Sequence, residues 1–142
     1  MVALRLDPTY GAYLDRLPGT TLATTNLVSF FGLHRRWRGA LVGHLALFEM
    51  TSVEPMGRYS RALERFGLSP NARRFYDVHV VADAHHEIVA ATDLAGGLAE
   101  TEPALAGDIL FGARAVMALE ERFTHHLLGS WAAGVRSLRS PL

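Results

Sequence analysis

The sequence contains no cysteine, no lysine and no glutamine among its 142 residues. Without cysteine, the chain can form no disulfide, thiolate nucleophile, cysteine-bound zinc site or iron–sulfur cluster. Without lysine, it can form neither a Schiff base with a carbonyl substrate nor a phosphate-binding P-loop. Any metal ion must therefore be held by histidine, aspartate or glutamate.

An excess of one charge and long apolar runs are also absent. The 14 basic residues are all arginine and balance 14 acidic residues, which argues against a general electrostatic attraction to nucleic acid or anionic lipid. No run reaches the roughly 18 apolar residues of a membrane span, and the first five residues lack the apolar core of a signal peptide. We expect a cytoplasmic protein with no nucleic-acid or membrane partner.

Helical spacing of apolar residues prevails over the alternation that is typical of strands. A hydrophobic content of 49% suits one folded domain over residues 1–142. Proline and glycine signals divide this domain into five or six helices, which predicts an all-α helical bundle. The expected helices cover about 8–17, 22–32, 34–50, 53–66, 71–91 or beyond, and 104–128. Gly96-Gly97 is expected to end the fifth of them with a break, and residues 134–142 are expected to form a loose tail.

The most informative segment places three polar residues on one face of a helix. His79, Asp83 and His86 stand at i, i+4 and i+7, and at about 100° per residue they fall within roughly 60° of each other. Their flanks are apolar, so we expect them to be buried and to need partners, either each other or a metal ion. Glu87 lies beside this face and can accept a hydrogen bond from a ligand, whereas His85 points away from it.

A second signal lies on the preceding long helix. Glu49 ends an otherwise apolar stripe that begins at Val42, and a buried carboxylate needs either an arginine partner or a metal ion. His44 lies on a different face, where a core histidine is the simplest interpretation. We take His44 and Tyr59, together with Glu87, as candidates to support the metal ligands.

Two further clusters have simpler interpretations. The basic cluster His34-Arg35-Arg36-Trp37-Arg38 is typical of a solvated face or of carboxylate partners, because the rest of the chain is neutral. Glu121 and His125 stand at i, i+4, a spacing that suits two metal ligands but equally suits a hydrogen bond at the surface, which we favour.

The metal-ligand candidates resemble those of a known family. His79-x-x-x-Asp83-x-x-His86, after a helix with Gly43-His44-Leu45-x-x-x-Glu49, resembles the haem-oxygenase-like diiron oxidases and oxygenases. More narrowly, it resembles the actinobacterial iron-containing redox enzymes. Similar local sequence includes Leu22-Ala23-Thr24-Thr25-Asn26-Leu27 and Arg38-Gly39-Ala40-Leu41-Val42-Gly43-His44, and the resemblance covers nearly the whole chain.

The resemblance implies an all-α haem-oxygenase-like fold and a non-haem diiron centre, Fe(II)/Fe(III), that activates dioxygen; no haem is expected. Glu49 matches the carboxylate of a middle helix, and His79, Asp83 and His86 match the ligand triad of a late helix. The family takes a further glutamate and usually a histidine from an earlier part of the chain. The present sequence therefore resembles the C-terminal half of a longer enzyme, a partial version of the fold.

The number of candidate ligands also indicates a partial site, because carboxylate-bridged diiron sites in helical bundles use about four carboxylates and two histidines.

Two functional hypotheses follow. In the first, the chain is all or part of a diiron oxidase or oxygenase that acts with O2 on a small organic substrate. In the second, it is a metal-free helical interaction module or a truncated subunit. A metal-independent relative acting on a heterocycle is disfavoured, since that chemistry usually needs a cysteine.

Removing helices from a bundle exposes the apolar faces that they covered. We therefore expect a homodimer or association with a missing N-terminal half. The residues expected at this interface are Leu22, Leu27, Phe30, Val42 and Leu45.

Overall fold

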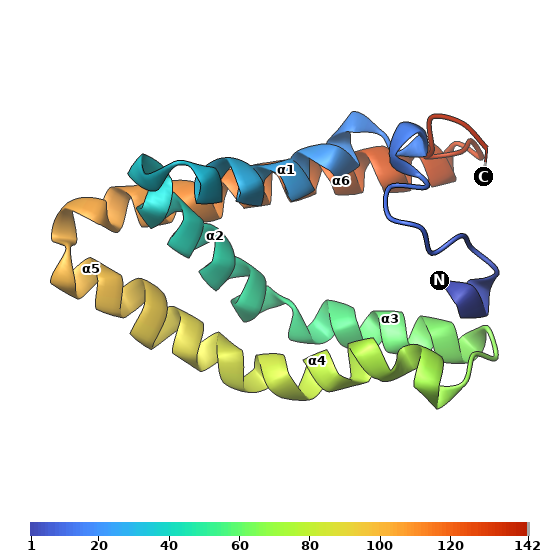
Figure 1. The fold of residues 1–142 in the computed structure, drawn as a ribbon, viewed down its shortest axis with the longest axis horizontal. Coiled ribbons are helices and arrows are strands. Elements are labelled where there is room, and N and C mark those ends of the chain that lie inside the picture. Colours follow the sequence, from blue (N-terminus) through green and yellow to red (C-terminus); the bar gives the residue numbers. More distant parts are fainter. Residues whose placement is uncertain (142) are drawn as a thin grey trace. The chain divides into compact units, whose positions relative to one another are not determined.

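A computed structural model describes residues 1–141, of which residue 2 by its backbone alone. Its regular elements are all helical and no strand occurs in these residues, which confirms the predicted all-α fold (Figure 1). The main elements are α1 (Gly19–Leu33), α2 (Arg38–Thr51), α3 (Val53–Arg65), α4 (Pro70–Val89), the π-helical segment η4 (Ala90–Gly96), α5 (Gly97–Thr101) and α6 (Ala106–Ala132).

The chain divides into two compact units. The first unit comprises Met1–Arg38 and the chain from Arg114 onwards, and the second unit comprises Gly39–Ala113. All four predicted metal ligands belong to the second unit. The division refines the sequence-based expectation of one domain, which stays a prediction.

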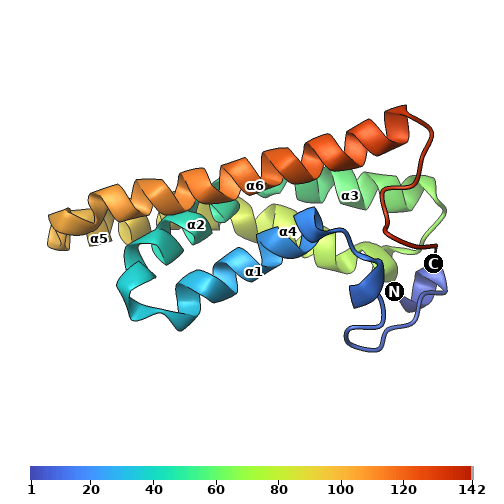
Figure 2. The ribbon, with the colours of Figure 1, turned by 90° about the horizontal axis from the view of Figure 1, so that it is seen from above.

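In the second unit, α3 and α4 form an antiparallel helical hairpin (Figures 1 and 2). The predicted stop at Gly67 is confirmed: this residue has a φ of 74°, and its amide donates to the Glu64 carbonyl while the Leu68 amide donates to the Leu63 carbonyl. These two bonds define a Schellman motif, which favours glycine at this position. The predicted start at Ser69-Pro70 is also confirmed.

A hydrogen bond, a ring contact and an ion pair between side chains hold the two helices of the hairpin together. The buried Ser60 hydroxyl donates a hydrogen bond to Asp77. Tyr59 and Tyr76 pack with ring centroids 5.5 Å apart. An ion pair of 2.8 Å joins Arg73 to Glu64. Polar and aromatic contacts thus fix the register of α3 against α4.

The crossing of α2 with the first turns of α6 differs from the α3–α4 hairpin, because here the two backbones are in direct contact. A Cβ atom added at Gly43 would overlap the carbonyl group of Ile109, and one added at Gly112 would overlap the carbonyl group of Ala40. Ala40 and Ile109 are buried. Only glycine allows so close an approach at these two positions.

The predicted break at Gly96-Gly97 is wrong. Both glycines have helical dihedral angles, with φ near −60°, and the chain stays helical through η4 and α5 as far as Thr101. A glycine lowers the helical preference by only about 1 kcal/mol, so two of them do not end a helix by themselves. In place of a break, the helix widens into a π-helical segment.

In the first unit, one sequence-based prediction of a helix is wrong and the start of another is shifted. The expected helix over 8–17 is reduced to a single 3-10 turn, Leu14–Arg16. The expected helix over 34–50 begins one residue later, because His34 is extended; the 3-10 turn Arg35–Trp37 forms its first turn and leads directly into α2. Trp37 packs against Phe31, with ring centroids 6.1 Å apart, and Phe31 is buried.

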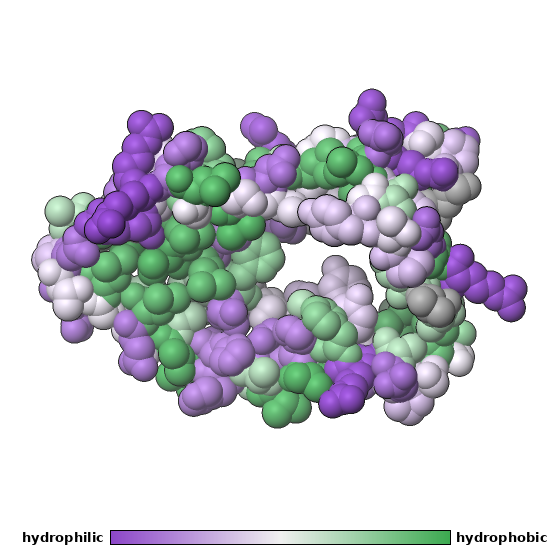
Figure 3. Space-filling model, viewed as in Figure 1, coloured by the Kyte–Doolittle hydropathy of each residue, from purple (hydrophilic) through white to green (hydrophobic). Residues whose placement is uncertain are grey.

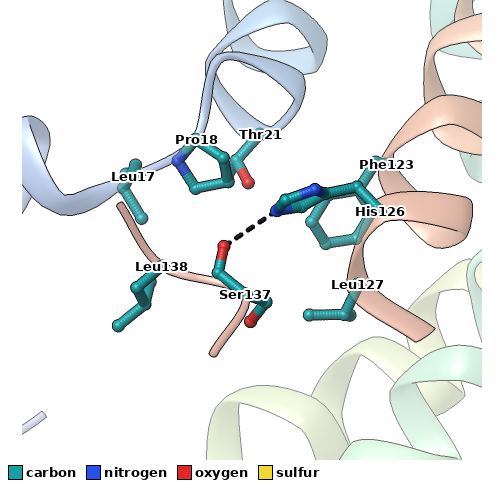
Figure 4. Close-up of a pocket in the computed structure, with 8 residues that line it drawn as sticks. All are labelled: Leu17, Pro18, Thr21, Phe123, His126, Leu127, Ser137 and Leu138. Atoms are coloured by element: carbon teal, nitrogen blue, oxygen red, sulfur yellow. Dashed lines mark hydrogen bonds between the residues drawn. The ribbon is translucent and has the colours of Figure 1, made fainter. Parts of the chain in front are cut away.

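The C-terminal segment, predicted to be loose, makes defined contacts within the first unit. The Arg139 amide donates to the Arg16 carbonyl at 2.9 Å, and His126 Nε2 donates to the Ser137 carbonyl at 2.8 Å. Figure 4 shows this second bond at the edge of a largely apolar pocket of about 190 Å³. The pocket is lined by Leu17, Pro18, Thr21, Phe123, His126, Leu127, Ser137 and Leu138.

Candidate metal centre

The second unit brings two carboxylates and one imidazole together. Glu49 comes from the last turn of α2, and Asp83 and His86 come from α4. Each offers one ligand atom, and these three atoms all lie within 4.8 Å of one another. His86 Nδ1 is 3.2 Å from Glu49 Oε2 and 3.4 Å from Asp83 Oδ1. Within residues 1–141, no other set of three or more such side chains converges in this way.

Ser52 holds the Asp83 carboxylate in place. Its hydroxyl lies 2.6 Å from Asp83 Oδ2 and donates a hydrogen bond to it, so that Oδ1 is the oxygen that faces His86. Ser52 is the N-cap residue of α3, yet its side chain makes no capping bond to that helix. A serine at this position normally bonds to a free amide at the start of its helix. The Ser52 hydroxyl instead orients Asp83, a candidate ligand, as the hydrogen-bond partners of metal ligands commonly do.

The three ligand candidates differ in exposure. Asp83 is buried, the Glu49 side chain is 29% exposed, and the His86 side chain is 52% exposed. The sequence-based expectation that the whole polar face is buried is therefore confirmed for Asp83 alone. The group is closed on the side of Asp83 and open on the side of His86, so further ligands can reach it from there.

The donor set fits a divalent transition-metal ion. Carboxylate oxygen and imidazole nitrogen together suit non-haem iron(II). Ligand atoms bound about 2.1 Å from one ion and at right angles to each other are about 3.0 Å apart. The two separations from His86 Nδ1, 3.2 and 3.4 Å, are close to this value.

His79 lies on α4 outside this group. Its Nδ1 is 2.6 Å from the carbonyl oxygen of Phe75 and donates a proton to it, while the two rings pack with centroids 4.2 Å apart. In a neutral imidazole, this bond leaves the lone pair on Nε2. His79 therefore has the tautomer and the fixed ring orientation of a metal ligand, although it does not join Glu49, Asp83 and His86 in the structure.

The candidate supporting residues lie in different surroundings. His44 is buried and stacks on Phe48 at a centroid distance of 4.9 Å, which confirms the prediction of a core histidine. Burial lowers the pKa of His44 below its usual value because it disfavours the charged imidazolium. Tyr59 is 53% exposed, and Glu87 and His85 are exposed on α4.

The basic cluster and the pair Glu121 and His125, both given simpler interpretations from sequence, lie in the first unit. Glu121 and His125 are exposed and line a shallow pocket with Thr20, Arg122 and His126. Arg36 packs over the Trp37 ring at 5.2 Å. Neither cluster forms a convergent group of three ligand atoms among the described residues.

Sequence reasoning missed Ser52 as a site residue. Its position before Val53-Glu54-Pro55 is typical of a helix N-cap, and that assignment of the local structure is right. Nothing in the spacing reveals that its hydroxyl reaches a residue 31 positions later in the chain.

An all-α fold with candidate carboxylate and imidazole ligands on α2 and α4 is typical of helical metalloproteins. The chain belongs to the family of iron-containing redox enzymes, whose model matches residues 1–121. This match also confirms the resemblance to the haem-oxygenase-like proteins. Comparisons with curated proteins and with solved structures give no match. Among residues 1–141, no helix combines the length and the apolar character needed to span a bilayer.

Proposed function

We propose that the chain is a non-haem iron oxidoreductase, or the ligand-bearing portion of one, that uses dioxygen on a small organic substrate. The observation that carries this proposal is the convergence of Glu49, Asp83 and His86 within 4.8 Å in a chain that belongs to an iron-containing redox family. Iron in such a site supplies one-electron redox chemistry and open positions for dioxygen.

Each residue has a separate task in this proposal. Glu49 and Asp83 supply two negative charges, which offset the charge of a divalent iron ion and favour its retention. His86 supplies a neutral nitrogen donor at the exposed side, where dioxygen and substrate enter. Ser52 donates a hydrogen bond to Asp83 Oδ2, so that Oδ1, the oxygen that faces His86, would be the one left to hold the ion.

A dinuclear centre is the finer form of the proposal. His79, held by the Phe75 carbonyl with Nε2 as the unprotonated nitrogen, would serve a second iron ion beside the first. Two carboxylates and two histidines are fewer than the about six ligands of carboxylate-bridged diiron sites. The remaining ligands would come from another segment or another chain.

A metal-free role is the alternative, and one contact favours it. The 3.2 Å separation of His86 Nδ1 from Glu49 Oε2 is also the geometry of a hydrogen bond. A proton on His86 Nδ1 would then occupy the place that the first proposal gives to iron. Such a chain would be a structural or interaction module.

Anaerobic iron(II) titration of the full chain separates the two roles. We expect stoichiometric binding by the native chain and a sharp loss of affinity in Asp83→Asn and Glu49→Gln, which keep volume and hydrogen bonding. His85→Ala is the matched control, because His85 is an exposed histidine next to His86 and outside the group. Absence of iron binding by the native chain, or an equal loss in His85→Ala, would refute the proposed site.

A further inference from the structure

The side of α4 that faces away from α3 carries large apolar side chains that the described chain leaves exposed. We call these five residues the α4 stripe. Their exposed fractions are 60% for Phe75, 53% for Val78, 76% for Val81, 63% for Ile88 and 38% for Val89. Hydrophobic side chains, separated by hydrophilic ones, are visible along the bottom of Figure 3, where α4 lies.

The stripe has the width of a helix face that packs against a core. At about 100° per residue, its five members span roughly 140° of the helix circumference, and a core-facing stripe is at least about 100° wide. Tyr76 and Asp83, which face α3 and the candidate metal centre, lie on the other side of the helix. Within the second unit, α4 thus has one face that packs against other residues and one apolar face that the unit leaves exposed.

The area of the stripe matches the need of a symmetric dimer. Its exposed apolar side chains amount to roughly 450 Å² per copy, which is as large as the largest patch on a typical monomer. Two such stripes packed together would bury roughly 1,000 Å² once their polar margins are included, and this is the lower bound of a specific interface. A two-fold contact uses the same patch on both chains, so one stripe supplies both sides.

Charges at the two ends of the stripe fix the relative direction of the two helices. Arg74, next to Phe75, is an exposed cation at one end. Asp93, an exposed anion, follows Val89 by about one turn of the π-helical segment at the other end. An antiparallel pairing sets each Arg74 opposite the Asp93 of the second copy, whereas a parallel pairing sets like charges together.

We propose that the α4 stripe is a self-association surface, on which two copies of this chain pair their α4 helices antiparallel about a two-fold axis at the level of Asp83, which lies about midway between Arg74 and Asp93 along the helix. This surface differs from the interface expected from sequence, which involved helices over 22–32 and 34–50. The proposal is independent of iron and of the proposed function. It places the contact on the same helix as Asp83 and His86.

The absence of cysteine allows a direct test in the full chain. A single Val81→Cys places one thiol within one helical turn of this axis, so mild oxidation is expected to give a disulfide-linked dimer. Leu110→Cys is the matched control, because Leu110 is an apolar residue of α6 with 58% exposure outside the stripe. The double variant Arg74→Cys/Asp93→Cys is expected to cross-link as well, and each of its single variants much less.

Light scattering and a charge substitution complete the test. The native chain is expected to show twice the monomer mass at about 10–100 μM, and Val81→Glu is expected to weaken the dimer at least about tenfold, with Leu110→Glu unchanged. Circular dichroism checks that Val81→Glu keeps its helix content. A monomeric native chain, or a Val81→Cys variant that cross-links no faster than Leu110→Cys, would overturn the proposal.

Discussion

The two helix pairings of the second unit are built on opposite principles. α2 crosses α6 through Gly43 and Gly112, where the backbones meet and no side chain can be inserted. α3 pairs with α4 through side chains, such as the bond from Ser60 to Asp77 and the stacked rings of Tyr59 and Tyr76. The first pairing tolerates no added volume, whereas the second can exchange one side-chain contact for another.

The candidate metal centre joins these two pairings. Glu49 stands at the end of α2, whose position is set by the glycine crossing, and Asp83 and His86 stand on α4, whose position is set by the hairpin. A substitution at the crossing should therefore destabilise the whole second unit, whereas a substitution in the hairpin should lower its stability by a smaller amount. The following variants test this difference, starting with the largest expected effect.

Gly43→Ala is expected to destabilise the protein by about 3 kcal/mol, because the new methyl group overlaps the Ile109 carbonyl and the two backbones must separate. The thermal midpoint should fall by roughly 10 °C. Gly107→Ala is the matched control on α6, since a Cβ there meets nothing within 4 Å. It should be neutral or slightly stabilising. Equal effects of the two variants would show that the crossing is not tight.

Ser52→Ala is expected to weaken iron(II) binding by about 10- to 100-fold, the usual cost of losing a residue that orients a ligand. The reason is that Asp83 loses the donor to its Oδ2 and gains rotational freedom. Thr51→Ala is the control, because the Thr51 hydroxyl bonds to the Leu47 carbonyl of its own helix. An affinity in Ser52→Ala equal to that of Thr51→Ala would contradict the orienting role.

Ser60→Ala is expected to lower the free energy of unfolding by about 1 kcal/mol, because it removes one side-chain hydrogen bond from the hairpin. Asp77 is exposed and can bond to water in its place. Urea unfolding of Ser60→Ala, Asp77→Ala and the double variant measures the coupling between the two. Strictly additive effects would indicate that the bond contributes nothing.

The smallest expected effect concerns pH. Because burial lowers the pKa of His44 from its ordinary value of 6.5, the unfolded chain binds more protons than the folded chain between the lowered pKa and 6.5. Stability should therefore fall as the pH decreases through this window. His44→Phe should show a smaller fall when chemical denaturation is compared at about pH 7.5 and pH 5.5. An unchanged fall would assign the pH dependence to other groups.

Local signals in the sequence predicted those parts of the fold that depend on backbone chemistry. Gly67 and Ser69-Pro70 set the hairpin between α3 and α4 as expected, because a left-handed residue and an N-terminal proline act within a few positions. The end expected at Gly96-Gly97 was wrong because tertiary packing overrides a weak helical preference. The glycine crossing could not be predicted, since nothing in the sequence tells which glycine meets another helix.

The candidate site was predicted in part for a similar reason. Angular spacing correctly places Asp83 and His86 on one face of α4, and Glu49 joins them in space. The same spacing includes His79, which lies outside the group, because the angle around a helix says nothing of the distance along it. Metal binding by His79 and by the other three residues stays a prediction. Ser52 acts across 31 positions and leaves no local signal.

The short connection between α3 and α4 has a consequence for the order of folding. The bond from Ser60 to Asp77 within this hairpin joins residues 17 positions apart, whereas the bond from Glu49 to His86 spans 37 positions. Closing a longer loop costs more chain entropy, so the hairpin is expected to form first. Its formation shortens the loop that remains between α2 and the end of α4. The ligand cluster is therefore expected to assemble after the hairpin, and its members meet only on a hairpin that has already folded.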